Sequence, residues 1–300
     1  MKGILTDIQR FSLKDGPGIR TTVFFKGCNM TCKWCHNPET LSIAPQLLRY
    51  PRKCIGCGSC LTVCPTGACF LDEKGMLAYD RLKCIHCGIC AENCFSGALV
   101  LSGRRMDVDE VMAEVIQDAD YYRNSGGGVT LSGGEIAMQH EFAGQLLATL
   151  KAKGISTAVE TNMLADWSRY EKLIPCLDLT MVDIKLFSEE EHRKWTGAGN
   201  QSILENIRKM SDTGIPIIVR TPVIPGVNDD EGEIGRIADF IASLRHVEYY
   251  ELLQFNPLGE SKYGALSLEN EFAGVRPLDT GHMEPLAKAA ERSRVPVRIG

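Results

Sequence analysis

The distribution of cysteine restricts this chain more than any other feature of its sequence. Twelve of the 13 cysteines lie between Cys28 and Cys94, and only Cys176 lies outside that stretch of the 300-residue chain. Secreted proteins that depend on disulfides are typically short and rich in cysteine throughout. The sequence opens with Met1-Lys2-Gly3 and a mixed segment, without the apolar stretch of a signal peptide. We therefore expect a cytoplasmic protein whose cysteines bind metal.

The overall composition is typical of a soluble globular protein. Apolar residues make up 44% of the chain and charged residues 24%. Lys and Arg number 33 against 38 Asp and Glu, so the formal net charge is −5. This balance argues against a nucleic-acid partner, which a clustered basic surface would bind. No run approaches the roughly 18 apolar residues of a membrane span, so we expect no membrane partner.

The first cysteine motif has the spacing Cys28-x3-Cys32-x2-Cys35 and follows a predicted strand at Thr21–Phe25. Three thiolates on one short loop can hold three corners of a [4Fe–4S] cube and leave the fourth iron open to substrate. Structural zinc and iron–sulfur sites normally have four protein ligands. The alternatives are therefore a zinc site with a distant fourth ligand, or three packed cysteines. The position near the N-terminus, ahead of a βα array, favours the open cluster.

The second group of cysteines forms an internal repeat, in which Lys53–Ala68 recurs as Lys83–Ala98. Each copy has the Cys-x2-Cys-x2-Cys-x3-Cys spacing of bacterial two-cluster ferredoxins, where the fourth cysteine of each run ligates the other cluster. A pair of zinc knuckles is the alternative. Phe95 replaces the usual second proline, and Cys69 and Cys176 fall outside the runs, where we expect them to be packed. The predicted ligands are Cys54, Cys57, Cys60 and Cys94 for one cluster, and Cys84, Cys87, Cys90 and Cys64 for the other.

Most of the remaining chain alternates between strand-like and helix-like segments. An additional amphipathic helix begins near Asp107, which with Glu110 resembles a capping box. Strands that each lead into a helix or insertion predict a parallel α/β sheet, open or curled into a partial barrel. We divide the chain into a core segment 1–47, a ferredoxin-like insert 48–101 and the rest of the core, 102–300. The predicted strands are Thr21–Phe25, Gly128–Ser132, Ser156–Glu160, Leu177–Ile184, Ile215–Arg220 and Val247–Gln254, and helices are predicted at Ser202–Ser211 and Glu231–Leu244.

The three-cysteine motif followed by this array resembles the radical SAM superfamily, which implies a partial (β/α)6 TIM-like barrel with the ferredoxin-like domain inserted. The segment 15–21 (Asp-Gly-Pro-Gly-Ile-Arg-Thr) and the segment 35–39 (Cys-His-Asn-Pro-Glu) resemble more narrowly the activating enzymes of glycyl radical enzymes, of the pyruvate formate-lyase activating type. The resemblance covers nearly the whole chain. It also implies that Asp15 contacts the partner peptide.

The resemblance places S-adenosylmethionine (SAM) at the carboxyl ends of the predicted strands, where barrel enzymes collect their chemistry. Gly133, Gly134 and Glu135 match a motif that contacts the methionine amine of SAM, although Ile136 replaces the usual proline. Asp183 and Lys185 match positions near SAM. Arg220 matches an arginine near the SAM carboxylate and ribose, and its fork suits a carboxylate. Asn256 stands where many relatives carry a histidine, so it can form hydrogen bonds but cannot titrate.

A monovalent cation is a further cofactor of some family members. Glu160, Thr161, Met181 and Asp183 match the positions that bind it. Glu160 is longer than the aspartate of some relatives, which counts against the ion here.

The function that the resemblance implies is activation of a partner protein. A reduced cluster at Cys28, Cys32 and Cys35 passes one electron to SAM, and the resulting 5′-deoxyadenosyl radical abstracts a Cα hydrogen from a glycine of a glycyl radical enzyme. The cofactors are then three [4Fe–4S] clusters and SAM, and the reaction is expected to be anaerobic. Flavodoxin or ferredoxin is the expected electron donor, and we favour electron relay by the inserted clusters over a structural or docking role. The alternatives are a radical SAM enzyme with another substrate and a non-catalytic electron carrier.

Overall fold

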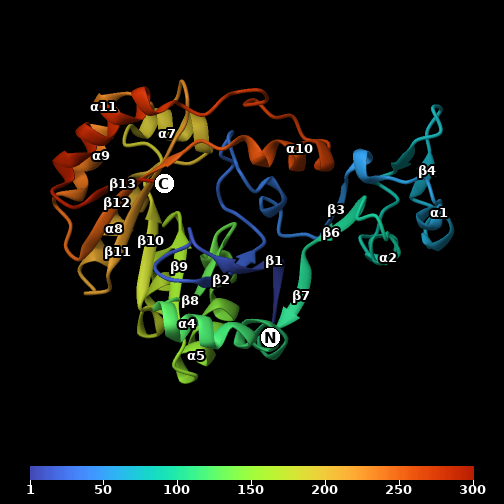
Figure 1. Cartoon of the computed structure of the whole chain (residues 1–300), viewed down its shortest axis with the longest axis horizontal. Helices are drawn as coiled ribbons and strands as arrows, with labels where there is room; N and C mark the ends of the chain where they lie inside the picture. Colours follow the sequence, from blue (N-terminus) through green and yellow to red (C-terminus); the bar gives the residue numbers. More distant parts are fainter.

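The computed structural model describes all 300 residues, and its main feature is a curved sheet of nine strands in the order β13-β12-β11-β10-β9-β8-β2-β1-β7 (Figure 1). Each neighbouring pair from β2 to β13 is parallel. This confirms the predicted α/β sheet with helices between parallel strands. The parallel strands are β2 (Arg20–Phe25), β8 (Gly128–Gly133), β9 (Ser156–Thr161), β10 (Leu179–Asp183), β11 (Ile217–Val223), β12 (Val247–Gln254) and β13 (Val297–Ile299).

Two antiparallel strands extend one edge of the sheet, and their pairing was not predicted from the sequence. β1 (Lys2–Ser12) runs antiparallel to β2, and β7 (Arg104–Asp107) runs antiparallel to β1. β7 immediately follows the insert. The long insertion between β2 and β8 therefore returns to the sheet through an extra strand, which pairs with the N-terminal strand.

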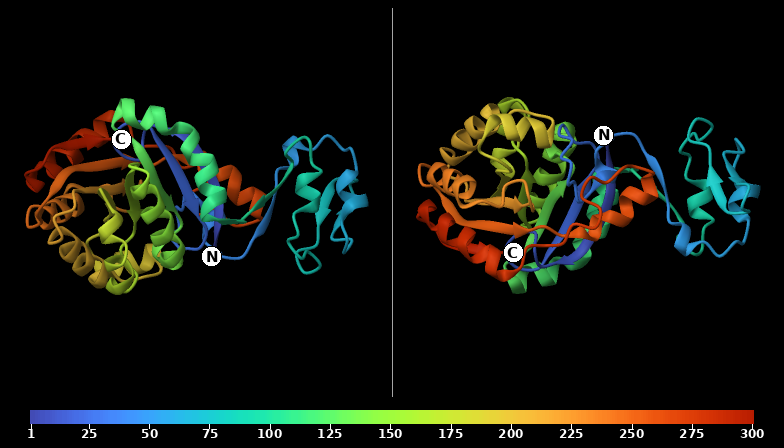
Figure 2. Two further views of the ribbon diagram at one scale, coloured as in Figure 1. Left: turned by 90° about the horizontal axis from the view of Figure 1, so that it is seen from below. Right: turned by 90° about the horizontal axis from the view of Figure 1, so that it is seen from above.

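Helices cover the outer face of the sheet (Figures 1 and 2). The predicted capping box is confirmed, since Asp107 accepts from the backbone of Glu110 and Glu110 accepts from the backbone of Asp107. The helices of the core are α3 (Val108–Val115), α4 (Ala119–Ser125), α5 (His140–Ala152), α6 (Trp167–Glu171), α7 (Glu189–Thr196), α8 (Gln201–Ser211), α9 (Glu231–Ile241), α10 (Glu260–Leu266) and α11 (Thr280–Ala290). Short 3-10 turns lie at Pro38–Thr40, Pro51–Lys53, Ile116–Asp118, Ile136–Gln139, Ile174–Cys176, Pro257–Gly259 and Glu291–Ser293.

The two faces of the parallel strands pack against different partners, because side chains alternate along a strand. Val159, Val182 and Val219 face the helices and join the main apolar core. Met181 and Ile218 lie on the opposite face, in a smaller cluster inside the curve of the sheet. The same inner face carries the polar residues of the candidate site at the carboxyl ends of the strands. No helix combines the length and the apolar composition that a membrane crossing requires.

The insert forms a separate lobe at one end of the molecule (Figure 2). β3 (Gln46–Arg49) and β6 (Leu99–Ser102) pair antiparallel where the chain enters and leaves this lobe. α10 of the core packs against β3, and Ala265 and Leu266 of α10 form a small apolar cluster with Leu48. The lobe also contains α1 (Ser59–Val63), β4 (Cys69–Leu71), β5 (Leu77–Tyr79) and α2 (Ile89–Glu92).

Candidate active site and cluster pockets

The loop that carries Cys28, Cys32 and Cys35 leaves the carboxyl end of β2 and is held in its middle and at its end. The backbone nitrogens of Thr31 and Lys33 donate to carbonyls at the end of α7, over 2.9 and 3.0 Å. The Tyr263 hydroxyl of α10 donates to the carbonyl of Cys35 over 2.9 Å. All three thiols are half-buried. The loop is therefore held by elements that lie far apart in the sequence.

The three thiols form a donor set that fits an iron–sulfur cluster. Burial raises the pKa of Cys28 to about 11 and that of Cys35 to about 12, so without metal these groups are neutral thiols. Bound metal reverses this, because a coordinating thiol is deprotonated. The amide nitrogen of Asn162 lies 3.8 Å from the Cys28 sulfur and donates to the Asn29 side chain over 2.9 Å. The loop thus offers three sulfurs and one amide donor on a fixed backbone.

Asp183 and Lys185 follow β10 and lie beside these thiols. Their side chains form an ion pair of 2.6 Å, with exposed fractions of 18% and 13%. Burial alone lowers the pKa of Lys185, but the negative charge of Asp183 raises it above its ordinary value. The structure therefore brings this predicted pair to the cysteine loop, with the lysine fully charged.

Arg220 of β11 lies between two carboxylates on the inner face of the sheet. Its guanidinium donates to Glu160 over 3.0 Å, to Glu251 over 2.8 Å and to the carbonyl of Lys14 over 2.6 Å. Burial lowers the pKa of Arg220, but Glu160 and Glu251 raise it above its ordinary value. The arginine predicted to bind the SAM carboxylate is thus already bonded to groups of its own chain. Glu251 was not predicted at this site.

Glu135 is turned into the protein interior. Its carboxylate is fully buried and accepts bonds from Thr161 Oγ1 over 2.9 Å and from the backbone nitrogens of Asn162 and Ala137 over 2.8 and 3.0 Å. Burial raises its pKa. The carboxylate is thus bonded within the protein and stabilises the turn after β9.

The two glycines before Glu135 are explained by close backbone packing. A Cβ atom at Gly134 would lie 2.2 Å from the carbonyl oxygen of Gly27, and one at Gly133 would lie 2.5 Å from that of Phe25. Gly133 also has a φ of +106°, which favours glycine. We expected these glycines to admit a ligand. The group that approaches them is the backbone that leads into Cys28.

The segment that begins with Asp15 folds against the sheet. The Asp15 carboxylate accepts bonds from the hydroxyls of Ser12 and Thr22, over 2.5 and 2.6 Å. Arg20 is 1% exposed and donates to Thr130 Oγ1 over 2.7 Å, and burial lowers its pKa to about 10. This segment therefore has a structural role in the free protein. Contact of Asp15 with a partner peptide stays a prediction.

Three of the four residues matched to the cation site are bonded to other side chains. Glu160 pairs with Arg220, Thr161 donates to Glu135 and Asp183 pairs with Lys185. No group of three or more His, Cys, Asp or Glu side chains converges tightly enough for a single metal ion. Asn256 is exposed, and its side chain accepts a bond from the backbone nitrogen of Leu258 over 3.0 Å.

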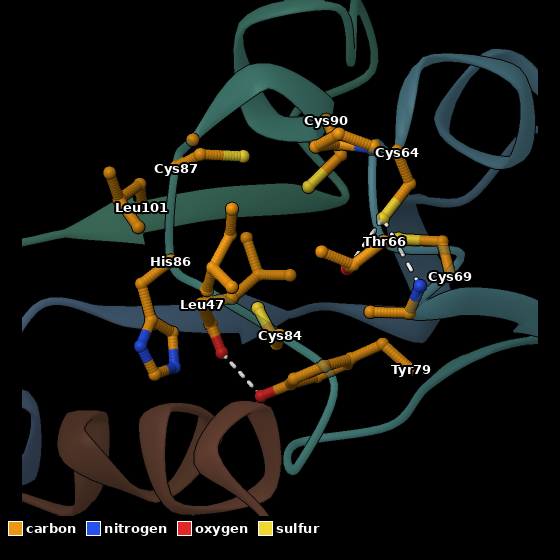
Figure 3. A pocket seen from close by; sticks show the side chains of 14 residues that line it. Leu47, Cys64, Thr66, Cys69, Tyr79, Cys84, His86, Cys87, Cys90 and Leu101 are labelled. Carbon is orange, nitrogen blue, oxygen red and sulfur yellow. Dashed lines mark hydrogen bonds between the residues drawn. The ribbon is translucent and has the colours of Figure 1, made fainter.

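The cysteines of the insert line two separate pockets. Figure 3 shows one of them, in which Cys64 from the first run lies with Cys84, Cys87 and Cys90 from the second. The other pocket contains Cys54, Cys57, Cys60 and Cys94. The structure thus groups the cysteines in the crossed arrangement of two-cluster ferredoxins. In each pocket a backbone nitrogen donates to the sulfur of the cysteine that comes from the other run. Ala68 donates to Cys64 over 3.2 Å, and Leu99 donates to Cys94 over 3.4 Å.

Several residues that contact this site were not predicted from the sequence. Asn162 had a detectable signal, since it follows directly on Thr161 at a strand end. Tyr263 and Lys262 had none, because they lie in a distant helix. The Lys262 ammonium contacts Glu39 over 2.6 Å, close to the end of the cysteine loop.

Comparisons with known proteins agree with this architecture. Residues 81–238 match the family described as "Radical SAM superfamily", and residues 53–98 match the "4Fe-4S dicluster domain". The chain is 39% identical over 305 residues to the benzylsuccinate synthase activating enzyme of Thauera aromatica, which covers 99% of this chain and 92% of the relative. It is 43% identical over 274 residues to the isethionate sulfite-lyase activating enzyme of Desulfovibrio desulfuricans, with 89% and 88% covered.

A solved domain of a pyruvate-formate lyase-activating enzyme from Bacteroides vulgatus is also similar. It superposes with a TM-score of 0.50 at 28% identity, over 58% of this chain and 99% of that domain. The radical SAM family match over more than half of the chain, on this parallel sheet, identifies a radical SAM enzyme. Given the identity and coverage of its relatives, the chain belongs to the activating enzymes of glycyl radical enzymes. Both parts of the predicted resemblance are confirmed.

Proposed function

We propose that this protein activates a glycyl radical enzyme by abstracting a Cα hydrogen from one of its glycines. The observation that carries the proposal is the three-thiol loop at the carboxyl end of β2, with Lys185 and Asn162 directed at it. Cys28, Cys32 and Cys35 would hold a [4Fe–4S] cluster with one open iron. The relatives are named as activating enzymes, which supports the class of partner.

The bound cofactors supply the radical chemistry: one electron and SAM give methionine and a 5′-deoxyadenosyl radical, which takes the glycine hydrogen and leaves a glycyl radical and 5′-deoxyadenosine. The chain's own residues bind and orient. Lys185 supplies a positive charge, and Asp183 offers a carboxylate to an amino group. Arg220, released from Glu160 or shared with it, would face the SAM carboxylate. The backbone of Gly133 and Gly134 would contact the methionine amine, as the family motif implies.

The insert is proposed to hold two further [4Fe–4S] clusters in the pockets described above. We propose that it receives electrons from flavodoxin or ferredoxin. The pocket with Cys84 contains Leu47 of β3, and β3 packs against α10, whose Tyr263 reaches Cys35. This continuity between the insert and the cysteine loop supports relay rather than a purely structural role.

The test is formation of the product radical. The reconstituted and reduced protein is mixed with SAM and candidate glycyl radical enzymes, beginning with the one encoded beside it. A glycyl EPR doublet is expected, with deuterium from labelled partner glycine in 5′-deoxyadenosine. A Cys28→Ala, Cys32→Ala, Cys35→Ala triple variant should give no doublet. SAM cleavage without a doublet from any such partner would overturn the proposal, and full function of the triple variant would indicate an electron carrier.

A further inference from the structure

The pocket in Figure 3 contains a fifth cysteine that the ferredoxin pattern does not use. Cys69 lines this pocket together with Cys64, Cys84, Cys87 and Cys90. It is the first residue of β4 and is 6% exposed. We expected Cys69 to be packed, and it is buried, but its neighbours include the proposed ligands rather than apolar residues alone.

The side chain of Cys69 lies in the same pocket as that of Cys90. Cys90 is one of the four proposed ligands of the cluster in this pocket. A thiol is a weak donor and a thiolate or sulfide sulfur an acceptor, so the S–H group of Cys69 is placed to donate to a sulfur of the cluster that this pocket would hold or of its ligands.

The internal repeat supplies a matched comparison. Leu99 occupies in the second copy the position that Cys69 occupies in the first, five residues after the fourth cysteine. Both residues begin a strand and are buried. The other pocket has only its four run cysteines. The two clusters therefore differ by one thiol in otherwise corresponding places.

We propose that Cys69 is a non-ligating thiol that sets the reduction potential of the cluster held by Cys64, Cys84, Cys87 and Cys90 above that of its twin. This inference rests on the proposed cluster ligands. A hydrogen bond to a cluster sulfur is one of the factors that set the potential. The reduced cluster carries one more negative charge, so donation stabilises the reduced state more and raises the potential.

The position of this pocket shows which way the proposed difference in reduction potential would direct an electron. The Tyr79 hydroxyl, which borders the pocket, donates to the carbonyl of Leu47 over 2.7 Å. Leu48, the next residue, packs against α10 of the core. The cluster with the higher reduction potential is therefore the one beside the core. Transfer of an electron from the outer cluster to this cluster is then thermodynamically favourable.

The test compares reduction potentials in the full, anaerobically reconstituted chain, followed by EPR. Cys69→Leu copies the twin, Cys69→Ala avoids added bulk, and Cys69→Ser keeps a donor. We expect the leucine and alanine variants to lower the midpoint potential of the cluster in this pocket by about 59 mV, which for one electron is a tenfold change in the reduction equilibrium. Serine should retain most of the wild-type value. Leu99→Cys should raise the other midpoint, and Cys176→Ser is the control without effect.

Unchanged midpoints in Cys69→Leu or Cys69→Ala, at full iron content, would overturn the inference. Loss of one cluster's iron from both variants would also overturn it, because Cys69 would then be a ligand. Failure of the proposed function looks different, since the wild-type protein itself would then lack the iron and EPR signals of the two inserted clusters.

Discussion

The hydroxyl of Tyr263 donates a hydrogen bond to the backbone carbonyl of Cys35 over 2.9 Å, across 228 residues of sequence. The same helix packs on the insert through Leu266, whose carbonyl accepts from Arg81. α10 thus connects the three-cysteine loop, the core and the insert. A contact of this kind fixes the end of the loop where the third thiolate lies.

Replacing Tyr263 by phenylalanine removes this bond and leaves the ring in place. We expect a loss of about 1 kcal/mol of stability and faster extraction of iron from the three-cysteine loop. Thermal unfolding and chelator kinetics on the reconstituted protein measure both. Tyr121→Phe is the control, since Tyr121 is 48% exposed. Equal behaviour of the two variants would contradict the anchoring role.

The burial of His192 predicts that the stability of the protein depends on pH. It is 1% exposed in α7, and its Nδ1 bonds to the carbonyl of Ala198 over 2.6 Å. Burial lowers its pKa, and Lys185 lowers it further, against the opposing effects of the Ala198 carbonyl, Glu189 and Glu233. An unfolded histidine has a pKa of about 6.5. Below that pH the unfolded chain binds more protons, so stability is present above it and lost as the pH falls.

The measurement is urea unfolding of the cluster-loaded protein at pH 7.5 and 5.5. Stability should fall by roughly 1 kcal/mol toward the lower pH, and His192→Gln should remove most of this difference. The half-buried His140 supplies the matched variant His140→Gln, which should keep the wild-type slope. If His192→Gln retains the full slope, another group is responsible.

Asn162 is expected to tune the cluster of the three-cysteine loop. Asn162→Ala removes the amide that lies 3.8 Å from the Cys28 sulfur, which should lower the potential of that cluster. We expect 5′-deoxyadenosine formation with a fixed reductant to slow about tenfold, equivalent to about 1.4 kcal/mol. Asn29→Ala removes only the bond between the two side chains and should have a smaller effect. The opposite ranking of the two variants, at equal iron content, would disprove this role.

Gly134 should tolerate no side chain. Gly134→Ala places a Cβ 2.2 Å from the carbonyl oxygen of Gly27, just before Cys28, so the backbone on both sides must shift. We expect a loss of at least about 2 kcal/mol together with reduced iron content. Gly144→Ala in α5 meets no atom closer than 3.5 Å and should stabilise the helix by roughly 0.5–1 kcal/mol. Similar melting temperatures for the two variants would refute the packing argument.

The strands of the parallel sheet could be predicted because each is a continuous apolar run between turn residues. The prediction for Val247–Gln254 has the bounds of β12, and Ile215–Arg220 is displaced by only a few residues from β11. β1 and β7 could not be predicted as a pair. The two strands lie on either side of the insert, and antiparallel pairing at a sheet edge depends on where the returning chain arrives.

The site residues show the same division. Asp183 and Lys185 lie beside the cysteine loop, as the strand-end rule predicts. Glu135 and Arg220 were expected to face a ligand, but the structure bonds both to the chain itself. Glu251 was missed because an acidic residue inside a strand has no signal until a buried arginine on the next strand is known.

Spacing along the chain by itself predicted the three-cysteine loop and the two ferredoxin-like runs, since cysteines a few residues apart on one loop lie close together and match known cluster-binding spacings. Only the tertiary structure decided that Cys69 lies in the pocket of the second cysteine run, that Tyr263 holds the cysteine loop, and that Arg220 lies between Glu160 and Glu251. These relationships join residues on separate elements, and their energies depend on distance and burial in three dimensions, which no local pattern of residues encodes.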